Sequence, residues 1–368
     1  MKSFLKEKLK NLAVSNGLVA LLTRTAKEEG KEVGLEKLEV ALVEKLTKSS
    51  IITSATASCA IEGINVAETK ILAISEKRTS PKKREEYEVM NYKAALEFIY
   101  NSDPASLRPT PELIRRLHSL SMAATAGAGE FKTRDNLIIE ATESGDKLRF
   151  TPLSAKETEA GIDSLCLGYN NAIDKETAAP QICVAAFILD FTCIHPFADG
   201  NGRVSRLLTT AALLELGLKM PKLVSLEEIT QNREDQYYAA LALSSSGWHT
   251  GNHTLEPFIR FHLETLVEGY AELQKKIQRI KEPVTVIFAH NVPVSVRDKA
   301  FQGFKEVYEN AKWKVGELNT GRRVTIENYS TNLEKETFEK LKHASRLAER
   351  CLQKAEKVET SGNEFMAR

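Results

Sequence analysis

The feature that most constrains the fold is a 13-residue apolar run, ICVAAFILDFTCI (182–194), which starts two residues after Pro180. Proline suits the first turn of a helix. The run contains Asp190 and is too short for a bilayer core of roughly 30 Å, so it predicts a helix buried in protein. A second apolar pattern follows a Gly-Asn-Gly turn, in RVSRLLTTAALLELGL (203–218). The sequence therefore predicts two buried helices joined by a short polar turn.

The polar turn, HPFADGNGRVSR (195–206), combines groups that suit phosphate chemistry. Glycines at a helix N-terminus present free N–H groups and a positive dipole end to an anion. Arg203 and Arg206 lie three residues apart, so both can contact one polyphosphate chain. Asp199 can hold Mg²⁺ between the phosphates, and His195, with an ordinary pKa of about 6.5, can take a proton from an attacking hydroxyl. These residues predict a phosphoryl- or nucleotidyl-transfer site.

Helical periodicity dominates the rest of the chain, as in EEYEVMNYKAALEFIYN (85–101) and in the segment 254–281. One segment departs from it: NLIIEA and KLRF, separated by TESGD, predict a β-hairpin over 136–150. After Lys281 the β-branched, proline-containing segment 282–296 predicts a strand and the start of another domain.

Composition excludes several classes of protein. The 51 basic and 50 acidic residues give no global charge signal for nucleic acid or an anionic membrane. Five cysteines without a C-x-x-C pair form neither a disulfide framework nor a zinc spacing, which predicts a cytoplasmic location. The N-terminal apolar stretch is interrupted at 15–17, so no signal peptide is expected, and no membrane partner is predicted.

The polar turn resembles the Fic-domain motif, H-x-F-x-[D/E]-[G/A]-N-[G/K]-R-x-x-R, and fits every fixed position of it. Fic proteins are α-helical enzymes that typically transfer AMP from ATP to a Tyr, Ser or Thr hydroxyl of a target protein and release pyrophosphate. The resemblance implies a mainly α fold, an adenylyltransferase activity, ATP as substrate and Mg²⁺ as cofactor.

The resemblance also implies a role for each matching residue. His195 looks like the general base, and Phe197 like the anchor of the loop in the core. Asp199 would hold Mg²⁺. The remaining matches would bind the phosphates: Gly200, Asn201 and Gly202 as an anion hole, Arg203 at the transferred phosphate and Arg206 at the γ-phosphate. Downstream, Tyr237 or Tyr238 would border the adenine, although a Tyr pair on a helix also suits plain packing.

Two further elements take a meaning from the resemblance. The hairpin, with Leu137, Ile138, Ile139 and Phe150, resembles the flap by which Fic domains pair with an extended segment of a target protein. Upstream, Ser58-x-x-x-Glu62-Gly63 fits the inhibitory motif [S/T]-x-x-x-E-[G/N] of the subclass whose inhibitor precedes the Fic core. That reading implies that Glu62 pairs with Arg206 and denies it to the γ-phosphate. A helix closed by a C-cap glycine would produce the same pattern for structural reasons alone.

The predicted organisation has three parts. An N-terminal helical region, residues 1–105, contains the inhibitory helix at about 48–63, and residues 106–270 form the Fic core. Residues 283–368 form a small α/β or winged-helix-like domain of unknown role, the one part through which nucleic acid could bind. A homodimer is expected by family analogy alone.

Three alternatives stay open. The enzyme could use another donor, including one whose transfer phosphorylates the target, or could remove AMP. From a different class, the chain could be a regulatory or DNA-binding protein in which the Fic domain is idle. The intact His195, Asp199 and Asn201 favour activity.

Overall fold

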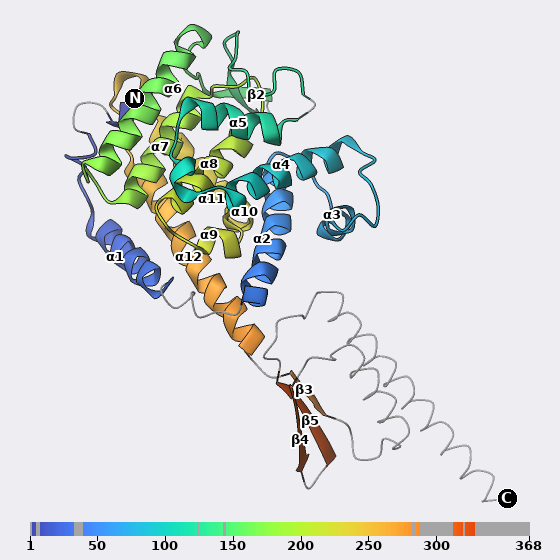
Figure 1. Cartoon of the computed structure of the whole chain (residues 1–368). Coiled ribbons are helices and arrows are strands. Elements are labelled where there is room, and N and C mark those ends of the chain that lie inside the picture. The colour runs from blue at the N-terminus through green and yellow to red at the C-terminus, as the bar shows by residue number, and fades with distance from the viewer. Residues whose placement is uncertain are drawn as a thin grey trace, which may run out of the picture. The chain divides into compact units, whose positions relative to one another are not determined.

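The computed structural model describes residues 2–4, 8–32, 40–123, 125–142, 145–281, 284–287, 312–318 and 321–327 (Figure 1). The chain divides into two compact units, Met1–Lys37 with Leu46–Leu273, and Leu38–Lys45 with Gln274–Arg368. The predicted N-terminal region and the predicted Fic core therefore share the first unit. Among the described residues no helix is both long and apolar enough to cross a membrane.

The first unit is built from helices, with one hairpin, which confirms the mainly α prediction. In chain order its elements are η1 (Lys2–Phe4), α1 (Asn16–Gly30), α2 (Val40–Ile61), α3 (Glu68–Ser75), α4 (Arg84–Asn101), η3 (Pro104–Leu107), α5 (Pro111–Ser121), α6 (Ala155–Asp174), α7 (Pro180–Ile194), α8 (Asn201–Glu215), α9 (Met220–Leu223), α10 (Leu226–Asn232), α11 (Glu234–Ser245), η4 (Trp248–Thr250) and α12 (Glu256–Lys281). The first turns of α2 and the end of α12 belong to the second unit.

The two helices predicted from the apolar runs form the centre of the core. In α7, 13 of the 15 residues are buried, which is typical of a helix that is apolar on all sides. Pro180 occupies its first turn. α8 follows after the six-residue turn 195–200, and packs against α4, α5 and α7. The polar turn between α7 and α8 is thus held on both sides by buried helices.

A two-stranded antiparallel hairpin follows α5 and consists of β1 (Ile138–Thr142) and β2 (Gly145–Phe150). Ile138 pairs with Phe150 and Ile139 with Leu148, with an irregularity in register between Ile138 and Ile139. The strands reach further into the predicted TESGD turn than the sequence suggested. Hydrogen bonds between the two strands satisfy backbone N–H and C=O groups that would have no partner if TESGD were a turn.

The second unit contains a three-stranded antiparallel sheet of order β3-β5-β4, formed by β3 (Val284–Ile287), β4 (Lys312–Leu318) and β5 (Gly321–Glu327). Val284 pairs with Ile326, and Lys312 with Glu327. The strand predicted after Lys281 is therefore present as β3. The rest of the predicted domain 283–368 lies outside the described residues.

One buried carboxylate interrupts the apolar interior of α7. Asp190 is fully buried and accepts hydrogen bonds from Ser3 N at 2.9 Å, Ser3 Oγ at 2.6 Å and Trp248 Nε1 at 2.6 Å. Burial raises the pKa of Asp190, against the effect of these donors. The carboxylate therefore joins η1, α7 and η4, three segments far apart in the sequence.

We expect Asp190→Ala to lower the free energy of unfolding of the first unit by about 3 kcal/mol. The substitution leaves three donors without their acceptor, and an unmade buried hydrogen bond costs about 1–3 kcal/mol. Urea denaturation followed by circular dichroism measures the change. Lys156→Ala, at an exposed position of α6, is the matched control and should change stability by less than about 0.5 kcal/mol. Equal stability of both variants would contradict the assignment.

Candidate active site

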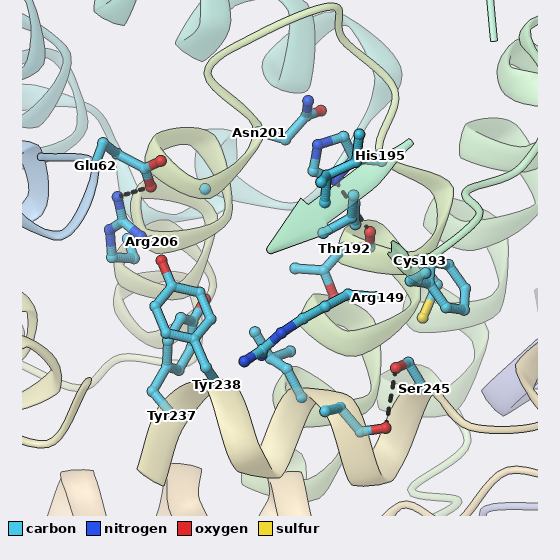
Figure 2. Close-up of a pocket in the computed structure, with 16 residues that line it drawn as sticks. Glu62, Arg149, Thr192, Cys193, His195, Asn201, Arg206, Tyr237, Tyr238 and Ser245 are labelled. Carbon is cyan, nitrogen blue, oxygen red and sulfur yellow. Dashed lines mark hydrogen bonds and ion pairs between the residues drawn. The ribbon is translucent and has the colours of Figure 1, made fainter. Parts of the chain in front are cut away.

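The candidate site is a pocket of about 440 Å³ into which several predicted residues point (Figure 2). Its walls come from the hairpin, the end of α7, the start of α8 and one side of α11, with Glu62 at one end. A pocket of this size suits a nucleotide-sized ligand. The predicted residues that line it are His195, Asn201, Gly202, Arg206, Tyr237, Tyr238, Glu62, Ile138, Ile139 and Phe150.

Arg206 is buried at this pocket and is held by the end of α2. Its Nε donates to Ser58 Oγ at 2.8 Å, and its Nη2 donates to Ser58 O at 2.9 Å and to Glu62 Oε1 at 2.8 Å. Burial opposes the charged guanidinium, but the carboxylate of Glu62 outweighs it and raises the pKa of Arg206. The arginine is therefore a fully charged group that three hydrogen bonds join to the Ser58-x-x-x-Glu62 segment.

Glycines place Glu62 at this position. Gly63 has a φ of +78°, and its N–H donates to Ala60 O at 2.8 Å, while Ile64 N donates to Cys59 O at 2.9 Å, which ends the helix by a left-handed cap. Across the gap Gly202 has no side chain, and a Cβ there would collide with Glu62 Oε1. The carboxylate therefore rests on the first turn of α8, where helix N–H groups favour negative charge. α2 itself is longer than the predicted 48–63, and Gly63 lies beyond its end.

His195 sits at the C-terminal end of α7 in a left-handed conformation, φ 50° and ψ 63°, which is unusual for a residue other than glycine. Its Nδ1 lies 3.4 Å from Thr192 O. A carbonyl only accepts, so Nδ1 carries the proton and Nε2 has a free lone pair. Burial lowers the pKa of His195 to about 4. The imidazole is therefore a neutral base at physiological pH.

The loop between the two helices is closed by Asn201 and Phe197. Phe197 N donates to Asn201 Oδ1 at 2.9 Å, and Asn201 Nδ2 donates back to Phe197 O at 2.8 Å. Asn201 lines the pocket, but both polar atoms of its side chain are engaged within the loop rather than extended toward a phosphate. The buried Phe197 ring stacks on His118, with 3.7 Å between the ring centroids. Phe197 therefore lies in the core at the position expected of a loop anchor.

His118 was not identified from the sequence, yet it supports the same loop. Gly129 N donates to its Nδ1 at 2.7 Å, so the ring proton is on Nε2, which donates to Asp199 O at 3.1 Å. Burial lowers the pKa of His118. A single histidine on the apolar side of α5 carries no sequence signal that separates this role from ordinary packing.

Besides the buried Phe197, three motif residues lie outside the pocket lining: Asp199, Gly200 and Arg203. Arg203 is only 3% exposed, and its Nη1 pairs with Glu88 Oε2 of α4 at 2.8 Å. Its Nη2 lies 3.6 Å from Asp199 Oδ2. Gly200 has a φ of +78°, and a Cβ there would approach Met122 Sδ at 2.8 Å. A side chain at Gly200 or Gly202 would therefore collide with its surroundings. Arg203 is oriented by Glu88, which lies 115 positions earlier in the chain.

The groups around Asp199 suit a cation that is held mainly by the phosphates of a bound ligand rather than by the protein. The Asp199 side chain is 66% exposed, and its Oδ1 accepts from Gly200 N at 2.6 Å. Within the described part of the chain no group of three or more His, Cys, Asp or Glu side chains is arranged to hold a metal. One exposed carboxylate suits Mg²⁺ that keeps its waters and binds phosphates, not a cage built from protein alone.

The tyrosines differ in environment. Tyr237 is buried, its ring 5.5 Å from that of Phe261, and packs into the core. Tyr238 is half-buried and faces the cavity, with the Arg149 guanidinium 5.9 Å from its ring centre (Figure 2). Arg149 comes from β2 and was not singled out in the sequence.

The predicted flap residues divide between two environments. Ile138, Ile139 and Phe150 line the pocket, and the Phe150 ring also stacks on His249 at 5.4 Å. Leu137 is 56% exposed and precedes β1. The hairpin therefore forms one wall of the pocket and also presents apolar side chains to solvent.

Comparisons with known proteins find similarity to one family. Residues 108–213 match the sequence model of the Fic/DOC family. A Fido domain-containing protein of Dictyostelium discoideum is 29% identical over 111 residues, which are 30% of this chain and 71% of that protein. The protein adenylyltransferase fic-1 of Caenorhabditis elegans is 28% identical over 201 residues, 52% of this chain. The chain spans only 35% of the length of that adenylyltransferase.

Solved structures share the fold at low identity. A Fic family protein from Desulfovibrio desulfuricans has a TM-score of 0.62 and 18% identity, covering 88% of this chain and 98% of its own. Fic-1 of C. elegans has a TM-score of 0.56 and 21% identity, covering 72% of this chain and 73% of its own.

We expect the His195 ring to stay neutral at pH 5.5, where a free imidazole is mostly protonated. Burial favours the neutral ring, and the midpoint should lie near 4. The unfolded chain binds this proton near pH 6.5, so the histidine's contribution to stability is present above 6.5 and is lost as the pH falls toward 4. NMR of ¹³C-labelled histidine rings measures the titration, with His195→Ala identifying the signal. A midpoint at 6 or above would contradict the assigned environment.

Proposed function

We propose, from the Fic/DOC domain that residues 108–213 form, that the protein is an autoinhibited adenylyltransferase that transfers AMP from ATP to a hydroxyl of a target protein. The observation that carries the proposal is the ion pair between the buried Arg206 and the partly exposed Glu62, in the same pocket as the neutral His195. A base, an arginine and a glycine-rich helix N-terminus converge there.

The pocket supplies the parts that the reaction needs. A Tyr, Ser or Thr hydroxyl gives its proton to His195 Nε2 while its oxygen forms a bond to the α-phosphorus of ATP. The bond from that phosphorus to the β,γ-bridging oxygen breaks, and pyrophosphate leaves. Gly202 and the free N–H groups of α8 would hold the phosphate oxygens, and Arg206 would bind the γ-phosphate.

Mg²⁺ would be held by Asp199 together with the ATP phosphates, and it would neutralise their charge. The exposed carboxylate of Asp199 beside Arg203 supports this assignment. Arg203, held by Glu88, would stabilise charge on the transferred phosphate.

Autoinhibition follows from competition for Arg206. Glu62 Oε1 lies 2.8 Å from Arg206 Nη2 and covers the first turn of α8 at Gly202. A γ-phosphate would need the same guanidinium and the same N–H groups, so ATP and the Glu62 carboxylate exclude each other there. Relief requires Glu62 to leave the pocket.

The hairpin would recognise the target by strand addition. Among the residues that the structure describes, its two strands pair only with each other, so each has an open edge, and Leu137, Ile139 and Leu148 are 53–56% exposed. Main-chain pairing at such an edge accepts many sequences, with apolar side chains adding affinity.

The first test incubates the wild-type protein, Glu62→Gly and His195→Ala with Mg²⁺ and ATP labelled at the α-phosphate, with and without cell lysate. Removing Glu62 should raise transfer by about tenfold or more, a change of roughly 1.4 kcal/mol. Removing His195 from the Glu62→Gly protein should lower it by roughly 10²–10⁴-fold. Glu85→Gln, at an exposed position of α4, is the charge-matched control and should leave transfer unchanged.

The outcomes separate the alternatives. Transfer of γ-label without α-label would identify phosphorylation instead of AMP transfer. Loss of preformed label from a modified protein would identify AMP removal. Failure of the Glu62→Gly protein to bind ATP at all would leave the domain as an idle scaffold and overturn the proposal.

We expect Asp199→Asn, in the Glu62→Gly protein, to raise the Mg²⁺ concentration for half-maximal transfer by about tenfold, because one charged ligand contact is lost. Titrating Mg²⁺ at saturating ATP measures the effect. Asp163→Asn, an exposed aspartate of α6, serves as control. An unchanged Mg²⁺ requirement would remove Asp199 from the metal site.

A further inference from the structure

Four successive carbonyl groups, starting with that of the last residue of α7, each accept a hydrogen bond from Lys132 or Asn136. Lys132 Nζ donates to Ile194 O at 3.0 Å, and Lys132 N donates to Pro196 O at 2.8 Å. Asn136 Nδ2 donates to Phe197 O at 3.0 Å and to His195 O at 3.4 Å. The carbonyls of residues 194–197 are therefore satisfied by one short segment that lies outside the loop.

The side chains of Lys132 and Asn136 are also hydrogen-bonded to each other. Lys132 Nζ donates to Asn136 Oδ1 at 2.8 Å, which fixes the orientation of the Asn136 amide and directs its NH₂ group to the loop. Lys132 is only 6% exposed, and burial lowers the pKa of its amine to about 8. The buried Lys132 ammonium thus has a carbonyl and an amide oxygen as acceptors. It lies at the C-terminal end of α7, where the negative end of the helix dipole favours a cation.

The backbone conformation of His195 explains why this loop needs hydrogen-bond donors from outside it. A helix end leaves carbonyls without partners, and His195 adds a left-handed conformation that costs about 1–3 kcal/mol and persists only where the surroundings impose it. The reciprocal Asn201–Phe197 bonds act within the loop and do not contact the His195 or Ile194 carbonyls. Lys132 and Asn136 act on both.

We propose that Lys132 and Asn136 are positioning residues, a carbonyl clamp that sets the place of the His195 ring for proton removal. The inference rests on the proposed function, because it takes His195 as the base. Neither residue lines the pocket, so neither would touch ATP or the target hydroxyl. Asn136 lies two residues before β1, so the clamp also ties the base to the start of the hairpin.

The test introduces Lys132→Met and Asn136→Leu separately into the Glu62→Gly protein. A misplaced base slows the chemical step but not nucleotide binding, so kcat should fall by about 10–100-fold while KM for ATP stays within about twofold. Lys132→Arg keeps the charge and the donors and should restore most of kcat. Lys156→Met, at an exposed position, is the matched lysine control.

A second readout does not depend on activity. Hydrogen exchange, measured by mass spectrometry, should become faster in peptides covering 191–201 in Lys132→Met and Asn136→Leu, but not in Lys132→Arg or Lys156→Met. Unchanged kcat, or unchanged exchange in this loop, would overturn the clamp. If the Glu62→Gly parent transfers no nucleotide while exchange rises as expected, the clamp on the loop stands and the proposed function fails.

Discussion

The buried guanidinium of Arg206 is the group on which the arrangement of this site depends. At 6% exposure its charge requires partners, because an unpaired buried charge costs several kcal/mol. Three hydrogen bonds of Arg206 end on Ser58 or Glu62, so the C-terminal end of α2 is held against the first turn of α8. Two of them end on Ser58 and do not involve Glu62. Loss of the Glu62 carboxylate would therefore leave the guanidinium hydrogen-bonded to Ser58.

Local chemistry made much of this site predictable. The apolar runs predicted two buried helices, because they are longer than an ordinary buried strand, and Gly200 and Gly202 predicted the turn between them. The Glu62–Arg206 pair was predicted from the resemblance to the inhibitory motif, and the four-residue spacing explains how Ser58 reaches the same arginine as Glu62. The hairpin was also evident, since its period of two contrasts with its helical surroundings.

What the sequence did not reveal are contacts made by tertiary packing. Arg203 meets Glu88 across 115 residues, and Asp190 meets Ser3 across 187. No periodicity encodes such pairs. Lys132 and Asn136 lie at 129–136 in GEFKTRDN, at the start of the predicted hairpin, and nothing in this segment indicates a contact with the loop at 194–197. Asn201, assigned to a phosphate by its motif, holds the loop with both polar atoms, a role that depends on the path of the backbone around it.

The two supports of the loop restrict how it can move. Asn201 and His118 fix Phe197 from within the core, whereas Lys132 and Asn136 hold the carbonyls from the side of the hairpin. A strand added to the hairpin would press on the segment that begins at Asn136, and so on the carbonyl of His195. By contrast, the Glu62–Arg206 pair lies on the α2 side of α8 and shares no hydrogen bond with this segment. Among the described residues, the hydrogen bonds that hold Arg206 are therefore distinct from those that hold the loop of His195, and Glu62 acts on His195 only through its charge, which raises the pKa of that ring.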